Sequence, residues 1–177
     1  MRRKLAGQEG LTLVEVLAAV VILVLLGLIL NAGMQMAVNS YRVMIAQSET
    51  ELLLSTLADT LADDLRYAED VVASGGKLDS YYSDSYGEDT TLELNNTEND
   101  PNKGKVYANS GGKKLRVLPD GAYGLNGRYV VEQMDITYEK GCFTLKLKVK
   151  EKDSTIHAET ELTVRCLNAK KEEETGG

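Results

Sequence analysis

One carboxylate stands out among the residues that could take part in chemistry. Glu15 opens a run in which the next charged side chain is Arg42. A carboxylate in apolar, membrane-like surroundings costs several kcal/mol unless it is paired, so its presence points to a function. Gly10 lies shortly before it and offers a protease an accessible peptide bond without a side chain. These two residues indicate a cleavage site followed by a charge that needs a partner.

Other reactive side chains are scarce. The chain has two cysteines, Cys142 and Cys166, and a single histidine, His157. This set is too small for a zinc site or a histidine-dependent triad, so we expect no enzyme activity, no metal and no cofactor. The acidic segment 79–89 contains three tyrosines and has oxygen ligands that calcium prefers, but its spacing matches no calcium loop. We expect His157 to lie on the solvent face of a strand.

Charge also limits the function. The 177 residues carry 20 basic and 27 acidic side chains, a net charge of −7. The first ten residues hold three basic side chains and one acidic one, so their removal leaves −9. Because this charge repels phosphate backbones, we expect no general nucleic-acid binding.

A long apolar segment follows the basic N-terminus. Residues 16–38 meet the length of about 20 residues that a membrane-spanning helix needs. The basic flank predicts a single-pass protein with its N-terminus in the cytoplasm and the rest outside. A secretory signal cleaved near Asn31-Ala32-Gly33 is one alternative. A plain signal anchor is another, but it does not explain Glu15.

The residues Gly10-Leu11-Thr12-Leu13-Val14-Glu15 follow a short basic leader and precede this apolar segment. This arrangement resembles the prepilin motif of type IV pilins and pseudopilins, closely over residues 1–40 and loosely beyond. The resemblance implies that a prepilin peptidase cleaves after Gly10 and methylates Leu11. It also implies that Glu15 pairs with the Leu11 amine of a neighbouring subunit, and that an assembly platform and an ATPase are partners.

The sequence departs from the family pattern in three places. The first residue after the cleavage site is Leu11, where the family usually has Phe, and Glu9 stands where a basic residue is frequent. The segment from Leu11 to Asp100 also lacks the proline that bends the helix of many major pilins. The third departure favours a minor pilin or a pseudopilin.

The leucines that follow the apolar segment predict a second, amphipathic half of the same helix. Leu53, Leu57, Leu61 and Leu65 are four residues apart, and Val72 continues the stripe. We predict a transmembrane or filament-core half over 11–40, an amphipathic half over 41–73 that covers a sheet, and a stop at residues 74–76. The leader would be 1–10.

The remaining residues predict strands. Residues 74–128 are polar and rich in turns, with short strands at 91–94, 105–108 and 114–118, and suggest a variable insert. Residues 129–168 alternate as three antiparallel strands, and 169–177 suggest a flexible tail. In the last hairpin, registers whose paired residue numbers sum to 307 or 309 place the row Lys146, Lys148 and Lys150 beside Glu159 and Glu161.

The same register bears on the cysteines. Cys142 falls on the lysine face and Cys166 on the apolar face, near one end of the hairpin. A disulfide between them requires both on one face, which a bulge at Gly141-Cys142 would allow. The alternatives are a disulfide, or a buried free Cys166 with an exposed Cys142.

Together these patterns predict an α+β, pilin-like ladle: a long helix whose second half packs on an antiparallel sheet. The expected function is a structural subunit, a minor pilin or pseudopilin, of a type IV pilus-like filament that acts in adhesion, secretion or competence. Such a subunit lies in the membrane lipid first and in an extracytoplasmic filament later. The alternative is an uncleaved, single-pass membrane sensor or binding module.

Overall fold

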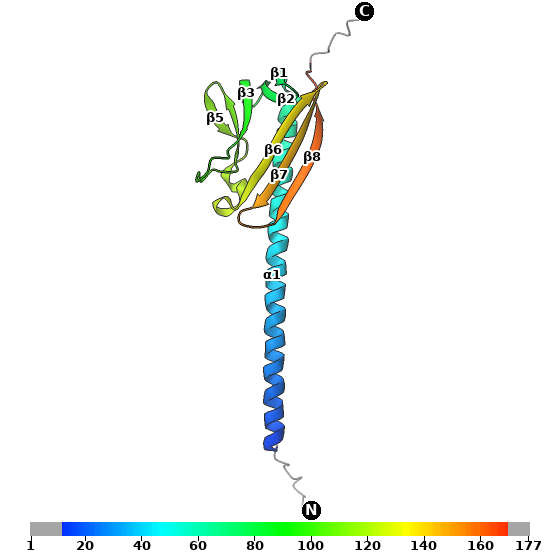
Figure 1. Cartoon of the computed structure of the whole chain (residues 1–177), viewed down its shortest axis with the longest axis vertical. Helices are drawn as coiled ribbons and strands as arrows, with labels where there is room; N and C mark the ends of the chain where they lie inside the picture. The colour runs from blue at the N-terminus through cyan, green and yellow to red at the C-terminus, as the bar shows by residue number, and fades with distance from the viewer. Residues whose placement is uncertain (1–11, 170–177) are drawn as a thin grey trace, which may run out of the picture. The chain divides into compact units, whose positions relative to one another are not determined.

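The computed structural model describes residues 12–169 and has one α-helix followed by eight strands (Figure 1). The helix is α1 (Leu13–Arg66), and the chain divides into two compact units, residues 1–43 and 44–177, that both include part of it. The strands are β1 (Glu69–Ser74), β2 (Lys77–Ser83), β3 (Gly87–Leu94), β4 (Val106–Ser110), β5 (Lys113–Arg116), β6 (Tyr129–Glu139), β7 (Cys142–Glu151) and β8 (His157–Arg165). Two 3-10 turns, Asp120–Tyr123 and Leu125–Gly127, lie between β5 and β6. The α+β class is as predicted.

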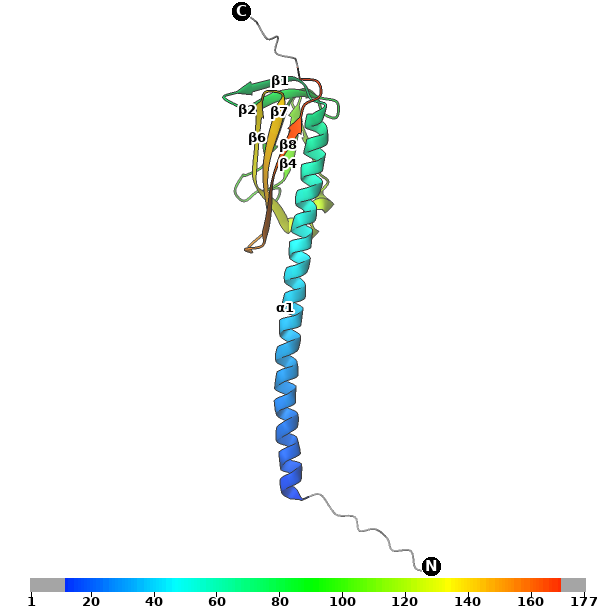
Figure 2. The same ribbon diagram turned by 90° about the vertical axis from the view of Figure 1, so that its right-hand side faces the viewer.

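The leucine stripe of α1 forms the centre of the core in the unit 44–177. Leu53, Leu57, Leu61 and Leu65 are each at most 1% exposed. They belong to one apolar cluster with the inward residues of β7, which are Phe143, Leu145, Leu147 and Val149. Figures 1 and 2 show this part of the helix along one face of β6, β7 and β8. Burial of each leucine contributes roughly 1.5–3 kcal/mol.

The end of α1 differs from the prediction. The helix stops at Arg66 rather than at Ala73, and residues 69–74 form β1. Two β-branched residues, Val71 and Val72, favour an extended backbone there. Gly75 and Gly76, at φ 61° and 82°, then form a two-residue turn that pairs β1 with β2. Val72 is therefore 52% exposed on a strand, and its assignment to the leucine stripe is wrong.

The sheet order is β5-β4-β3-β2-β6-β7-β8, and β1 pairs with β2. β2 pairs with β3 and with β6 through different residues. Tyr81 lies opposite Thr90 of β3, and Lys77 lies opposite Thr137 of β6. The segment 74–128, expected to be a variable insert, thus supplies four strands to the sheet that residues 129–168 complete. The short strands expected at 91–94, 105–108 and 114–118 overlap β3, β4 and β5.

The last hairpin has the predicted register. Cys142 lies opposite Arg165 and Lys146 opposite Glu161, so paired residue numbers sum to 307. Lys148 and Glu159 are also opposite each other. The alternation of apolar and charged residues limited the pairing to odd sums, because a shift by one residue would set the apolar face of one strand beside the charged face of the other. Of the two registers expected, the structure has 307.

One detail of β6 was not predicted. A bulge between Val131 and Gln133 shifts the register against β7, so that Val131 lies opposite Val149 and Met134 opposite Leu147. Val131 therefore faces the core, although Val130 is the residue that alternates in step with Met134 and Ile136. Val130 instead lies against Gly104: a Cβ at that glycine would be 2.4 Å from the Val130 Cβ. Residue 104 must therefore be glycine for the loop before β4 to approach β6.

Candidate functional site

The first part of α1 is apolar and uncovered. Every side chain from residue 12 to residue 45 is exposed, and Ala46 is the first buried one. We call residues 12–45 the uncovered half and residues 46–66 the covered half. The exposed leucines include Leu17, Leu23 and Leu30 at 64%, 66% and 72%. By length and composition this helix could cross a membrane.

Glu15 lies in the first turn of the uncovered half. Its Oε2 atom accepts hydrogen bonds from the Thr12 backbone N–H and the Thr12 hydroxyl, both at 3.3 Å. In return, the Glu15 backbone N–H donates to Thr12 Oγ1 at 3.3 Å. This reciprocal arrangement is a capping box, in which the first and fourth residues of the turn satisfy each other's donors.

The capping box was missed at the level of the sequence, although its signal is present. Thr12-Leu13-Val14-Glu15 is the Thr-x-x-Glu pattern that precedes an apolar helix. The exposed Glu15 thus has an additional role, because its carboxylate caps its own helix. The predicted cleavage residues Gly10 and Leu11 lie outside the described residues.

The two cysteines are both free. Cys166 is buried, and its thiol donates to the Ala68 backbone oxygen at 3.2 Å. Cys142 is half-buried and lies opposite Arg165. Burial raises the pKa of the Cys166 thiol. The structure therefore has the free-cysteine arrangement, with Cys142 more buried than expected, and not the disulfide.

The tyrosine-rich segment serves as a structural contact to the helix. Tyr81 is 1% exposed and its hydroxyl donates to Asp64 Oδ2 of α1 at 2.5 Å. Ser83 donates to the other oxygen of Asp64, also at 2.5 Å. Burial and then the Asp64 charge raise the pKa of Tyr81. A surface hollow of about 500 Å³ lies beside this contact and is lined by Asp63, Asp64, Asp84 and Tyr86 among others.

The loop before β4 contains a lysine whose ammonium group is paired within the protein. The Lys105 ammonium lies 2.6 Å from Asp120 Oδ1 and 3.0 Å from Asn102 Oδ1, and its side chain is 12% exposed. Asp100 accepts hydrogen bonds from Asn95 and from the Asn102 backbone, and these bonds lower the pKa of Asp100. Among residues 12–169, no group of three or more His, Cys, Asp or Glu side chains is placed to hold a metal.

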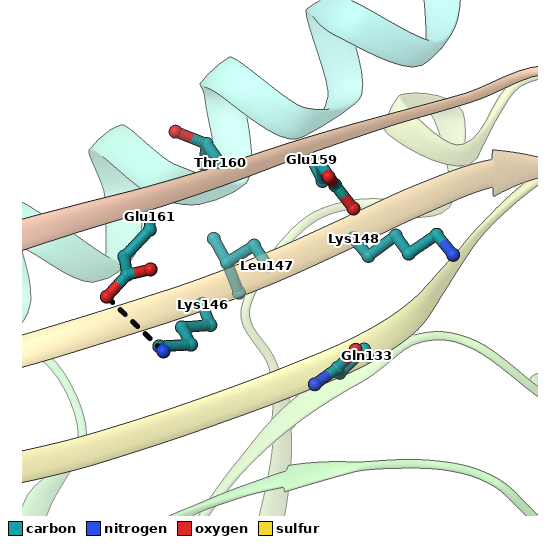
Figure 3. Close-up of a pocket in the computed structure, with 7 residues that line it drawn as sticks. All are labelled: Gln133, Lys146, Leu147, Lys148, Glu159, Thr160 and Glu161. Atoms are coloured by element: carbon teal, nitrogen blue, oxygen red, sulfur yellow. Dashed lines mark ion pairs between the residues drawn. The ribbon is translucent and has the colours of Figure 1, made fainter.

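The solvent face of the sheet has a second hollow, of about 400 Å³ (Figure 3). Its charges are largely paired: Lys146 lies 3.3 Å from Glu161, and Lys148 lies 3.0 Å from Glu132. His157, on the same strand as Glu161, is exposed as expected. This face provides a solvated row of charges that fixes the hairpin register.

Comparison with protein-family models, with curated proteins and with solved structures found no match to this chain. A function must therefore be argued from the chain's own residues. The uncovered half is the feature that the fold leaves unexplained, since an apolar helical surface of this size normally requires a membrane or a partner.

Proposed function

We propose that this chain is a structural subunit of a type IV pilus-like filament, a minor pilin or a pseudopilin. A prepilin peptidase removes residues 1–10 by cleavage after Gly10. The uncovered half first spans the cytoplasmic membrane, with the N-terminus in the cytoplasm, and later packs against the same segment of other subunits. The globular unit remains on the extracytoplasmic side throughout.

One observation carries the proposal: a single continuous helix has two halves with opposite requirements. The covered half buries one leucine stripe against its own sheet. Residues 16–30 of the uncovered half are apolar on all sides, and their side chains are exposed to an extent that water does not favour. A membrane lipid environment satisfies it before assembly, and a bundle of identical helices satisfies it afterwards.

Glu15 supplies the pairing between subunits. Residues 16–41 contain no charged side chain, so this carboxylate is the only charge in the helix that the membrane or the filament core surrounds. A free amine at residue 11, created by cleavage, is its natural partner on a neighbouring copy. A buried carboxylate and amine that must meet define one axial register between adjacent helices.

Intact-mass and N-terminal peptide mass spectrometry on the full chain, expressed in its own host, tests the processing step. We expect a chain that starts at Leu11, with or without one added methyl group. Gly10→Val should keep residues 1–10 attached, whereas Gly7→Val, a matched change in the leader, should be processed like the wild type. Retention of residues 1–10 in the wild-type chain would contradict the proposal and favour an uncleaved membrane-anchored binding module.

Electron microscopy and shearing of the same cells test assembly. The processed wild-type chain should appear in a sheared filament fraction, and the Gly10→Val chain should stay in the membrane fraction. A processed chain that never leaves the membrane would contradict a filament function even if cleavage occurs as expected.

A further inference from the structure

The sheet of the globular unit ends in two strands that each have a neighbour on one side only. Among residues 12–169, β5 pairs only with β4 and β8 only with β7, and Figure 1 shows them on opposite sides of the sheet. Each therefore has a row of backbone N–H and C=O groups without a strand beside it. The pairing of β8 with β7 runs from His157 to Arg165 without a register shift, whereas the register of β1 shifts at Val72. β8 thus offers a regular edge to which another strand can be added.

Charges on the solvent face of the sheet alternate in sign from strand to strand toward the β8 edge. β6 is acidic there, β7 is basic, and β8 is acidic again. In that order the residues are Glu132 and Asp135, then Lys146, Lys148 and Lys150, then Glu159 and Glu161. Glu159 has no ion pair among residues 12–169, because the ammonium of Lys148 opposite it contacts Glu132 instead. A strand added next to β8 should therefore be basic.

β5 is a basic strand and is itself an edge. Residues 113–116 are all exposed, and three of the four are basic. Leu115 lies opposite the buried Ala108 and so points to the core side, which places Lys114 and Arg116 on the other face. These two basic residues are as far apart along their strand as the two glutamates of β8. One register can therefore bring both basic residues beside both glutamates on the solvent face.

We propose that β5 of one copy pairs with β8 of a neighbouring copy, so that the sheet continues from subunit to subunit. This inference rests on the proposed filament function and names the surfaces through which the globular units meet. The contact joins two different surfaces, so it can be repeated along an open filament. It also covers apolar side chains at both edges, since Leu115 is 42% exposed and Leu162 of β8 is half-buried.

The charges on the two edges select this contact, and the uncovered halves strengthen it. A pairing through four residues of β5 is smaller than the interfaces that hold proteins together by themselves. Packing of the uncovered halves keeps neighbouring copies at a high effective concentration, so that a weak contact is sufficient. Pairing of β8 with β8, or of β5 with β5, would place like charges side by side and is disfavoured.

Reversal of one charge on each edge tests the pairing. Lys114→Glu changes β5 and Glu159→Lys changes β8, and each places like charges at the contact. Each variant should lower the fraction of processed full chain recovered in sheared filaments by about fivefold or more. Co-expression of the two variants should restore recovery to within about twofold of the wild type, because alternating copies again join opposite charges. A folding defect within either chain would not be rescued in this way. Lys152→Glu, at an exposed position outside both edges, is the control and should polymerise normally.

Disulfide cross-linking locates the contact without a charge reversal. In a Cys142→Ser background, a Lys114→Cys chain is co-expressed with a Glu159→Cys or a Glu161→Cys chain. At least one combination should give a dimer on non-reducing gels of sheared filaments, since neighbouring residues on paired strands have Cβ atoms about 4.5–5.5 Å apart. Lys114→Cys with Lys152→Cys should give none.

Three results would each overturn the inference: single reversals that polymerise normally, co-expression without rescue, and no dimer from either position of β8. In all three cases wild-type filaments remain intact. The absence of wild-type filaments would instead overturn the proposed function itself.

Discussion

The two halves of α1 are both rich in apolar residues, but these residues are distributed differently around the helix. The covered half has leucines on one face, aspartates such as Asp59 and Asp63 on others, and a sheet of its own to pack against. The uncovered half has Val, Leu and Ile on every face and no covering element among residues 12–169. The distribution of apolar residues around the helix, and not their number, therefore distinguishes a surface for internal packing from one for a lipid or a partner.

The largest expected difference between the halves concerns leucine truncation. Leu57→Ala removes a side chain that is 0% exposed and should lower the free energy of unfolding by about 2–5 kcal/mol. Leu25→Ala, at 54% exposure, should change it by less than about 0.5 kcal/mol. Urea unfolding of the full chain in detergent, followed by the near-ultraviolet circular dichroism of its tyrosines, measures both. Equal losses of unfolding free energy in the two variants would contradict the view that only the covered half packs within the protein.

A smaller difference is expected for tyrosine hydroxyls. Tyr81→Phe deprives Asp64 of one of its two donors and should cost about 1–3 kcal/mol of unfolding free energy. Tyr41→Phe changes a residue of the uncovered half that is 67% exposed and should cost nothing measurable. Thermal unfolding of the two variants gives the comparison. A Tyr81→Phe protein as stable as the wild type would show that the Asp64 contact contributes little to the covered half.

Two lysines of the loop before β4, Lys105 and Lys103, allow a largely buried and an exposed charge of the globular unit to be compared. Lys105→Met leaves Asn102 without its donor, while Asp120 keeps Arg116, so we expect a loss of about 1 kcal/mol. Lys103→Met, at an exposed position in the same loop, is the matched control and should be neutral. Protection of the loop amides in hydrogen exchange measures the local effect. The same protection in both variants would mean that the Lys105 ammonium does not hold the loop.

The smallest effect is a pH dependence confined to the globular unit. Hydrogen bonds from Lys150 and then Lys148 lower the pKa of Glu132 below 4.5. Because the folded-state pKa is the lower one, the stabilisation is present above pH 4.5 and is lost as the pH falls through the folded value. Glu132→Gln should thus cost less than about 1 kcal/mol near pH 7 and nothing in strong acid.

Urea unfolding at several pH values tests this sign. Glu15→Gln is the counterpart from the uncovered half, because within residues 12–169 the Glu15 side chain bonds only Thr12, and it should leave the acid unfolding of the globular unit unchanged. A Glu132→Gln protein whose stability difference grows toward low pH would contradict the assignment of the lysine pair as the cause.

Sequence patterns predicted those features that local periodicity specifies. The leucine stripe, the alternation in β7 and β8 and the restriction of the register sum to 307 or 309 all follow from which residues must avoid water. The end of the helix could not be found in this way, because Val72 fits a helical stripe as well as it fits a strand. Whether this segment continues the helix or forms a strand depends on β2, which pairs with β1.

Contacts between distant residues account for the rest. The Tyr81–Asp64 hydrogen bond joins a strand to a helix, and neither residue has a local pattern that indicates the other. The bulge in β6 likewise lies beside a distant contact, that of Val130 with Gly104. The capping box is different, since Thr12 and Glu15 form a recognisable short motif.

The order in which the covered half is synthesised has a consequence for its biogenesis. Its leucines are covered by β7, and the carbonyl of its last residue accepts from a distant part of the chain, where the Leu167 N–H donates to the Arg66 oxygen at 2.8 Å. At about 5–20 residues per second, a ribosome adds the intervening strands over roughly 5–20 seconds. During that interval the leucine stripe is exposed beside a segment that is long and apolar enough to cross a membrane. Nascent chains should therefore need chaperone protection until β8 is complete.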